Sequence, residues 1–493
     1  MPSLFLPSQR AGFAASGAVP RLAPQRLRQL VVLVGLALTG TVLAVEIVRY
    51  LALDAYLDHI EGSVASVGWG YAHGAPLYSL RDGYAEFTNI WGPYAYLTVV
   101  PALAALGPSV FASKLAAFMA AAATLALTAW RYRRGPAMPA VQGLFLLVAG
   151  MAALSPMSFW IRADPFEMLL VALALASPSP IVVGVCVGVA ANFKIHAFLY
   201  FLPILAELWL RRGWRAAPPV AFAAVAMFLL PFLAPGISLA DYATTVLPQL
   251  AGRRHAPELF APVAAYGIAF ALPVLLPLLR RPVPAVERAY GWAALGTLVL
   301  LAYPATLSGA GPYHFLPLLP VIAEARRRLT PQGIGAEFAV FPLLLFAAVT
   351  TQHCLADLDE RRAWPAYAEE ALQLAAAQPG PVAIGYGDNR RSYEIAQLVR
   401  SRLALSGAAP LLDAQIAMEL REIGVDGSRR YVAELTGCRT PRWLTPRGEA
   451  PFAVRSYFYD GGPLFDDAFR TAFLAHYRPV ATSAHFVLWA CGR

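Results

Sequence analysis

Charged side chains are scarce in this 493-residue chain and make up 14% of it, against about 25% in typical globular domains. With 58% hydrophobic residues, a water-soluble protein could not cover its surface with polar groups. An intrinsically disordered chain is excluded for the opposite reason, because so apolar a chain with 12% aromatic residues collapses in water. The composition therefore predicts a polytopic membrane protein.

Cysteine is scarce as well. The four cysteines form no C-x-x-C pair and are too few for a disulfide scaffold or a zinc ribbon. Cys186 lies in an apolar run, where a cysteine is usually a small buried hydrophobe. Cys438 and Cys491 lie in the polar C-terminal part, so a disulfide between them is an option if that part faces an oxidising compartment.

The positive charge is spread along the chain. A net charge of +9 on one basic patch of a soluble domain would suggest nucleic acid. The basic residues fall instead in short clusters between apolar runs, so we expect no nucleic-acid partner. All of them are arginines apart from Lys114 and Lys194.

Apolar stretches long enough to cross a hydrocarbon core of about 30 Å predict eleven membrane spans. These spans are 30–50, 109–130, 138–155, 165–177, 180–193, 195–210, 216–234, 260–279, 288–304, 312–325 and 336–352. Segment 93–107 is apolar but short and contains Pro101, so we expect it to lie in the membrane interface. The run 30–50 is too long for a signal peptide and lacks a small-x-small cleavage site, which makes it an uncleaved first span.

The positions of the arginines predict the orientation, since short cytoplasmic loops are rich in basic residues. With the N-terminus inside, the clusters all fall on inner loops: Arg10, Arg21, Arg26 and Arg28; Arg131, Arg133 and Arg134; Arg211, Arg212 and Arg215; Arg280, Arg281 and Arg288; Arg326, Arg327 and Arg328. Counting 93–107 as a span would move four clusters outside. The arginine-rich and alanine-rich composition is typical of a GC-rich bacterium, so we expect the bacterial cytoplasmic membrane.

The same orientation divides the chain into two domains. Residues 1–352 form the transmembrane domain, with a long first external loop over 51–92 and a second over 235–259. Residues 353–493 form a periplasmic tail. There, 382–387 reads as a strand ending at a glycine turn and 392–405 as an amphipathic helix, which predicts a small α/β domain.

Six ionisable residues are placed at the outer ends of the spans, where such groups are costly and are functional candidates. They are Glu61, Lys114, Arg162, Asp164, Lys194 and His314. Each also has a structural interpretation. Glu61 would be a carboxylate of a surface loop, and Arg162 and Asp164 would form an ion pair within a loop. Lys194 would be a snorkelling side chain, and His314 would be a structural histidine with its hydrogen bonds satisfied. Arg253 and Arg254, with His255, break the positive-inside pattern on the same face.

The ordered set resembles the GT-C fold integral-membrane glycosyltransferases, among them protein mannosyltransferases, which use polyprenyl-phosphate-linked sugars. The matching segments are Glu61-Gly62, Gly74-Ala75-Pro76-Leu77-Tyr78, Gly92-Pro93, Lys114, Arg162 with Asp164, Lys194, and His314 followed by Leu316-Pro317. Several relatives carry an Asp-Glu pair and a Lys-Pro, where this chain has Ile60-Glu61 and Gly92-Pro93. Because of this difference, either Glu61 or Asp58 could be the acidic residue of the family. The lysine that several relatives have before the proline, an expected phosphate ligand, is missing here.

The resemblance implies an all-helical GT-C transmembrane domain and an inverting transferase. It implies that Glu61, or Asp58, is the general base that deprotonates an acceptor hydroxyl. The donor phosphate would bind a set of cations and one histidine: Lys194, Arg162, Arg253, Arg254, Lys114 and His314. In some relatives a divalent metal takes part, so Mg or Mn held by Glu61 and Asp164 is a further expectation. The expected partners are the polyprenyl-phosphate sugar, an envelope acceptor and membrane lipids.

Two other function classes compete with this interpretation. A transporter or lipid flippase would also be polytopic, but such proteins usually show internal repeats and ionisable groups near the bilayer midplane. A non-catalytic envelope-assembly protein would act through residues 353–493, which contain no recognisable catalytic motif. The gathering of ionisable residues on one face favours the transferase.

Overall fold

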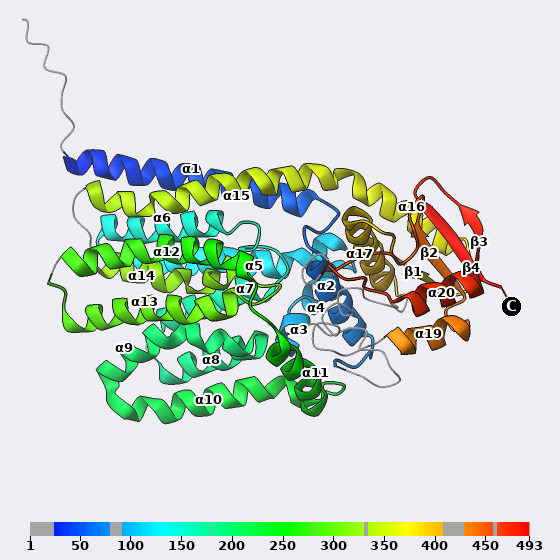
Figure 1. The fold of residues 1–493 in the computed structure, drawn as a ribbon. Coiled ribbons are helices and arrows are strands. Elements are labelled where there is room, and N and C mark those ends of the chain that lie inside the picture. The colour runs from blue at the N-terminus through cyan, green and yellow to red at the C-terminus, as the bar shows by residue number, and fades with distance from the viewer. Residues whose placement is uncertain are drawn as a thin grey trace, which may run out of the picture.

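Long antiparallel helices lie side by side in a bundle, and a small domain with a sheet sits at one end of it (Figure 1). A computed structural model describes residues 24–78, 91–177, 179–280, 282–329, 334–407, 428–456 and 461–492. Residues 79–90 of the predicted first loop, together with Arg10, Arg21 and Arg281, lie outside these ranges. We refer to the end that carries residues 361–492 as the domain end and to the opposite end as the basic end.

Each predicted span coincides with a helix or with a 3-10 helix that continues into an α-helix. The helices are α1 (Pro24–Ala52), α5 (Val110–Tyr132), α6 (Ala137–Ala153), α7 (Ala163–Ala176), α8 (Pro180–Phe193), η2 (Ile195–Phe201) with α9 (Leu202–Arg212), α10 (Ala217–Leu229) with η4 (Leu230–Leu233), α12 (Phe260–Arg280), α13 (Ala285–Ala305), η6 (Pro312–Leu318) with α14 (Leu319–Leu329), and η7 (Ile334–Val340) with α15 (Phe341–Glu360). In the described part of the chain, five helical segments are long and apolar enough to cross a membrane. The chain is a multi-pass membrane protein.

Apolar side chains cover the outside of the bundle. Val48 of α1 is 65% exposed, Phe222 of α10 is 79% exposed and Leu233 of η4 is 81% exposed. Such residues are stable on a surface when lipid tails are the solvent, and water would make them an aggregation hazard. The exposed apolar surface therefore agrees with a bundle surrounded by lipid.

Segment 93–107 does not span the bundle. It forms α3 (Pro93–Leu97) and α4 (Val100–Leu106), with Pro101 in the first turn of α4. At about 1.5 Å per residue, neither helix could cross a hydrocarbon core of about 30 Å. The expected single interfacial helix is thus two short ones. Both loops that the sequence predicts to be external also contain helices: α2 (His59–Ala72) in the first and α11 (Leu239–Gly252) in the second.

Two glycines bring α8 and α10 into close contact. A methyl group added at Gly184 would lie 2.4 Å from the carbonyl oxygen of Val220, and one at Gly188 would lie 2.1 Å from that of Ala224. This spacing is the small-xxx-small pattern that lets helix backbones approach in membranes. The close contact holds the end of α8, where Lys194 follows, against its neighbour.

The C-terminal domain is a small α/β domain, as the sequence predicts. Its helices are α16 (Trp364–Ala376), α17 (Arg390–Leu405), α19 (Ser428–Thr436) and α20 (Asp467–His476), and its strands are β1 (Val382–Ile384), β2 (Arg442–Pro446), β3 (Tyr477–Thr482) and β4 (Phe486–Cys491). The sheet order is β1-β2-β4-β3; β1 runs parallel to β2, and the other two pairs are antiparallel. Because α15 ends at Glu360 rather than at residue 352, one helix connects the membrane domain to this domain.

The domain is fixed onto the first loop. Arg361 donates to the carbonyl oxygen of Tyr56 over 3.2 Å, and Arg402 donates to that of Asp54 over 3.1 Å. Helix α17 packs along α2, where Gly62 leaves so little space that an added methyl group would lie 2.2 Å from Ser401 Oγ. Helix α2 is therefore held between the bundle and the C-terminal domain.

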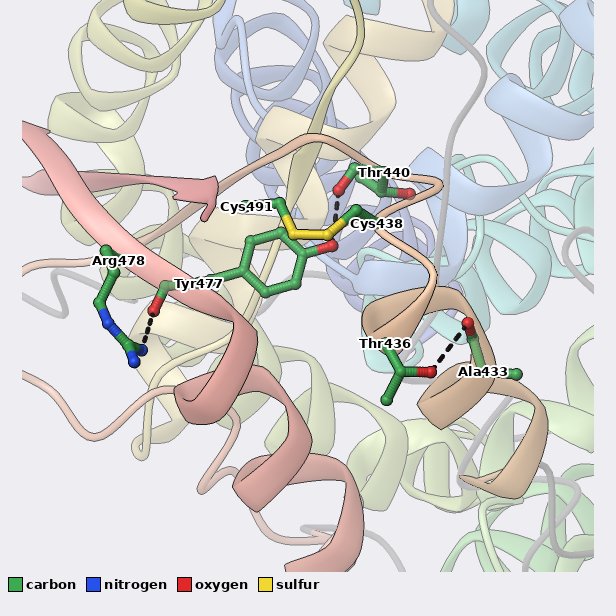
Figure 2. The surroundings of a disulfide bond; sticks show 7 residues. All are labelled: Ala433, Thr436, Cys438, Thr440, Tyr477, Arg478 and Cys491. Atoms are coloured by element: carbon green, nitrogen blue, oxygen red, sulfur yellow. Dashed lines mark hydrogen bonds between the residues drawn. A yellow bond between two sulfur atoms is a disulfide. The ribbon is translucent and has the colours of Figure 1, made fainter. Parts of the chain in front are cut away.

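A disulfide joins Cys438, just after α19, to Cys491 at the end of β4 (Figure 2). Beside it, the Tyr477 hydroxyl donates to the Thr440 carbonyl oxygen over 2.7 Å (Figure 2). The two cysteines are 53 residues apart, so the bond closes a long loop of the domain. The cysteines at 186 and 354 are buried and unpaired.

We expect the C438S/C491S variant to lose about 4 kcal/mol of the C-terminal domain's free energy of unfolding, because the unfolded chain regains the entropy of the opened loop. The measurement is thermal unfolding followed by tryptophan fluorescence. Reductant should destabilise the wild type in the same way and leave the double variant unchanged. Equal unfolding temperatures for wild type and variant would contradict this prediction.

Candidate functional site

The first loop carries its acidic residues at the start of α2. Asp58 is the N-cap: its carboxylate accepts from the Ile60 amide over 2.7 Å, while Glu61 Oε1 accepts from the Asp58 amide over 3.1 Å. This reciprocal arrangement is a capping box, which satisfies amides that a helix start leaves without partners. The Asp-x-x-Glu spacing in the sequence is the signal that could have predicted a helix here.

Glu61 is fully buried and surrounded by donors. Besides the Asp58 amide, its carboxylate accepts from the Leu57 amide over 2.7 Å, from the Ile161 amide over 3.3 Å and from the Tyr50 hydroxyl. Burial raises the pKa of this carboxyl above its ordinary value, against the opposing charge of Lys114. Glu61 thus connects α1, the start of α2 and the turn before α7.

Lys114 on α5 belongs to the same buried cluster. Its ammonium donates over 2.7 Å to the carbonyl oxygens of both Tyr50 and Leu53, and it lies 4.1 Å from the centre of the Tyr50 ring. These bonds close the C-terminal end of α1. Lys114 therefore lies with Glu61 and is not among the residues that line the cavity described below.

Asp58 differs from Glu61 in its access to solvent. Its side chain is 21% exposed and lies 3.4 Å from Nδ1 of His59. Burial opposes the charged form, but the charges of His59 and Arg162 outweigh it, so the pKa of the Asp58 carboxyl lies below its ordinary value. Asp58 is therefore an ionised carboxylate near the edge of the buried cluster.

A second cluster lies where α7 begins and α8 ends. The Lys194 ammonium bonds Asp164 Oδ1 over 2.5 Å and lies 3.7 Å from Glu167 Oε2. Arg162 Nε lies 3.5 Å from Asp164 Oδ2, which is the ion pair expected for this turn. An ammonium has three donors and a guanidinium has five, so both cations keep donors for a further anion.

Aromatic and histidine side chains surround these cations. The Arg162 guanidinium lies 4.3 Å from the ring centre of Tyr313, which limits the directions it can take. Nδ1 of His314 lies 3.0 Å from Nε2 of His196. The carbonyl oxygen of His314 accepts a hydrogen bond from the Tyr200 hydroxyl over 3.0 Å. The start of η6 is therefore fixed against η2.

A cavity opens beside this cluster at the domain end, with about 640 Å³ of empty space that includes its open mouth. Four of the predicted phosphate-binding residues line it: Arg162, Lys194, Arg253 and His314. Arg253 reaches it from the end of α11 and also donates to the Ser308 carbonyl oxygen over 3.1 Å. Arg254 has an exposed side chain and is not among the lining residues. The structure thus brings together residues from three distant parts of the chain.

The first loop reaches this cavity through Gly92 and Trp91. The Gly92 amide donates to the Phe193 carbonyl oxygen over 3.1 Å, and a methyl group on Gly92 would lie 1.5 Å from the Asn192 carbonyl oxygen. Only glycine permits this approach. The contact places Trp91 in the cavity wall, where the Arg162 guanidinium lies 5.5 Å from the centre of its ring.

The predicted metal ligands do not fit a shared metal site as they are held. Both oxygens of Glu61 accept hydrogen bonds, and Asp164 is paired with Lys194 and Arg162. Among the described residues, no three His, Cys, Asp or Glu side chains gather as a metal site would require. Binding of Mg or Mn by Glu61 and Asp164 stays a prediction.

Three contributors to the site are missing from the sequence prediction. Glu167 is buried one turn after Asp164. It could have been found in the sequence, because a carboxylate within a predicted span is a functional candidate. His196 and Tyr313 also line the cavity. His196 follows the predicted Lys194 by two residues and Tyr313 directly precedes the predicted His314, yet nothing in their spacing marks them as site residues.

The fold is similar to that of two crystal structures of ArnT from Cupriavidus metallidurans, one in the apo state and one bound to undecaprenyl phosphate. The identity is 13%, the match covers 92% of this chain and 98% of the ArnT chain, and the TM-scores are 0.56 and 0.57. No protein-family model and no curated protein sequence matches the chain. The similarity confirms the predicted fold: this chain has the polytopic helical GT-C architecture of ArnT, completed by a small C-terminal domain.

Proposed function

We propose that the protein is a membrane glycosyltransferase that moves a sugar from a polyprenyl-phosphate donor to an envelope acceptor. The observation that carries the proposal is the cavity at the domain end, where Arg162, Lys194 and Arg253 converge from three separate elements. The fold supports it, because a structure with the same architecture holds undecaprenyl phosphate.

Lys194 and Arg162 are the proposed main ligands of the donor phosphate. Both are buried, and in such surroundings a charge-assisted hydrogen bond to a phosphate oxygen is stronger than in water. Arg253 adds a third cation at the mouth of the cavity. As the bond between sugar and phosphate breaks, negative charge grows on the leaving phosphate, and these cations stabilise it.

We propose Asp58 as the general base, in preference to Glu61. The Glu61 carboxylate already accepts four hydrogen bonds within the protein and has no access to solvent. Asp58 is partly exposed and ionised, and its neighbour Ile60 lines the cavity. An acceptor hydroxyl would pass its proton to Asp58 while its oxygen attacks the anomeric carbon from the side opposite the phosphate, which inverts that carbon.

The proposed orientation puts the domain end in the periplasm of a bacterial inner membrane. The arginine clusters around residues 131, 212, 280 and 327 all lie at the basic end, as the positive-inside rule requires of a cytoplasmic face (Figure 1). Independently, a disulfide persists in an oxidising compartment, and the Cys438–Cys491 bond is in the domain at the other end.

Replacing the two acids should separate catalysis from folding. Asn caps helices as well as Asp does, so D58N should keep its thermal unfolding temperature and lose about 10²–10⁴-fold in transfer rate. E61Q places an amide NH₂ among donors and should lower stability by about 3–5 kcal/mol. Transfer from a radiolabelled polyprenyl-phosphate sugar and thermal unfolding in detergent measure the two effects. If D58N were fully active while E61Q were inactive but stable, the general base would be Glu61 and not Asp58.

Lys194 should act on donor binding. K194Q removes a charged contact worth about 1.5–3 kcal/mol and should weaken polyprenyl-phosphate binding by about tenfold to a hundredfold. K194R, which keeps the charge, is the matched control and should retain most of the affinity. Equal binding by the wild type and K194Q would exclude Lys194 as a phosphate ligand.

Reporter fusions test the orientation. Fusions after Trp130 and Leu210 should report the cytoplasm, and a fusion after Thr351 should report the periplasm. Trp130 and Leu210 lie in the last turns of α5 and α9, and Thr351 lies in the half of α15 that leads to the C-terminal domain. A periplasmic signal after Trp130 would reverse the proposed orientation.

A further inference from the structure

A second and larger cavity opens at the basic end, on the other side of the membrane domain from the donor site. It has about 1280 Å³ of empty space, including its open mouth, and lies among the ends of α5, α7, α8, α9, α13 and α14. In Figure 1 these ends gather opposite the C-terminal domain. Nothing in the proposed transfer reaction uses this cavity.

The polar side of the cavity is built from arginines that share a few carboxylates. Glu324 is fully buried and pairs with Arg131, Arg327 and Arg328 at 2.7–3.1 Å. Glu207 pairs with Arg328 and Arg211 at 2.9 Å. Because one carboxylate cannot engage all the donors of three guanidinium groups, donors remain for an outside anion.

The charge balance of the lining favours an anion. Five arginines line the cavity against three glutamates, so two positive charges remain uncompensated within it. Arg211 is 58% exposed and Arg212 is also exposed, which places both at the mouth. An anion arriving from the basic end would meet them first.

Part of the lining is apolar, and this distinguishes a lipid from a small ion. Leu175, Val183, Ile204 and Leu208 belong to that part. Trp209, two residues before Arg211, is exposed, and tryptophans are typical of the level where lipid head groups meet hydrocarbon. A ligand that meets both the arginines and these apolar side chains has a phosphate group joined directly to apolar chains.

We propose that this cavity binds the phosphate head group of an anionic phospholipid from the leaflet at the basic end. Basic pockets between transmembrane helices are suited to such head groups, and each arginine near the membrane surface contributes about a fivefold gain in affinity. The bound lipid would connect α9, α13 and α14. The inference goes beyond the proposed transfer reaction and does not depend on it.

The test uses the full-length protein, freed of lipid in detergent and titrated with phosphatidylglycerol while native mass spectrometry counts bound lipids. The wild type should bind phosphatidylglycerol at least tenfold more tightly than phosphatidylcholine. R211Q/R212Q removes two exposed charges without touching Glu324 and should weaken phosphatidylglycerol binding by about 25-fold. R280Q/R288Q is the matched control, because both arginines are exposed at the same end and neither lines the cavity; it should bind like the wild type.

Four results would overturn the proposal. Binding of phosphatidylcholine as tight as that of phosphatidylglycerol would show that the site does not require an anion. A loss of phosphatidylglycerol affinity in R280Q/R288Q equal to that in R211Q/R212Q would show that general surface charge is responsible. Displacement of phosphatidylglycerol by an equal concentration of inorganic phosphate would identify an ion site. Tighter binding of undecaprenyl phosphate, lost in R211Q/R212Q but retained in K194Q, would identify a second site for the carrier lipid. None of these results bears on sugar transfer at the domain end.

Discussion

Two buried charges that meet at Tyr50, Glu61 and Lys114, are the constraint on which the domain end depends. The carboxylate holds the end of α1, the start of α2 and the turn before α7, and the ammonium caps the last carbonyl groups of α1 from α5. Neither charge is stable at this depth without its partners, since an unpaired buried ion costs several kcal/mol. The two residues therefore fix the geometry of the first loop. That geometry places Arg162 in the cavity wall together with Ile60, whose amide donates to Asp58.

Most of the fold could be predicted from the sequence because the physical signals are strong. A hydrocarbon core of about 30 Å requires long apolar runs, and arginine clusters mark one side of them. These two rules place the helices of the bundle within a few residues, apart from the start of α1 and the end of α15, which extend beyond the predicted spans. They say little about short elements, since neither the break of 93–107 into two helices nor the helix in the first loop depends on crossing the membrane.

The sequence allows the residues of the candidate site to be named from their residue types, but it does not allow their individual roles to be assigned. Ionisable groups in an apolar chain stand out, so Arg162, Asp164, Lys194 and His314 could be named, and they do gather. Glu61 and Lys114 stand out for the same reason, yet they bond to backbone groups and, for Glu61, to the Tyr50 hydroxyl. Sequence shows that a charge needs partners; it does not show whether those partners belong to the protein or to a substrate.

Both ends of the bundle have a cavity lined by cations, but the cations are held in different ways. At the domain end, cations come from elements far apart in the sequence, so the cavity forms only when the first loop, α8 and α11 are all in place. At the basic end, the arginines come from the ends of the bundle helices α5, α9 and α14 and belong to the rim of the bundle itself. A site that includes a loop and the end of α11 can change shape as they move, which suits binding and release of the proposed donor. A site on the rim is tied to the stability of the bundle.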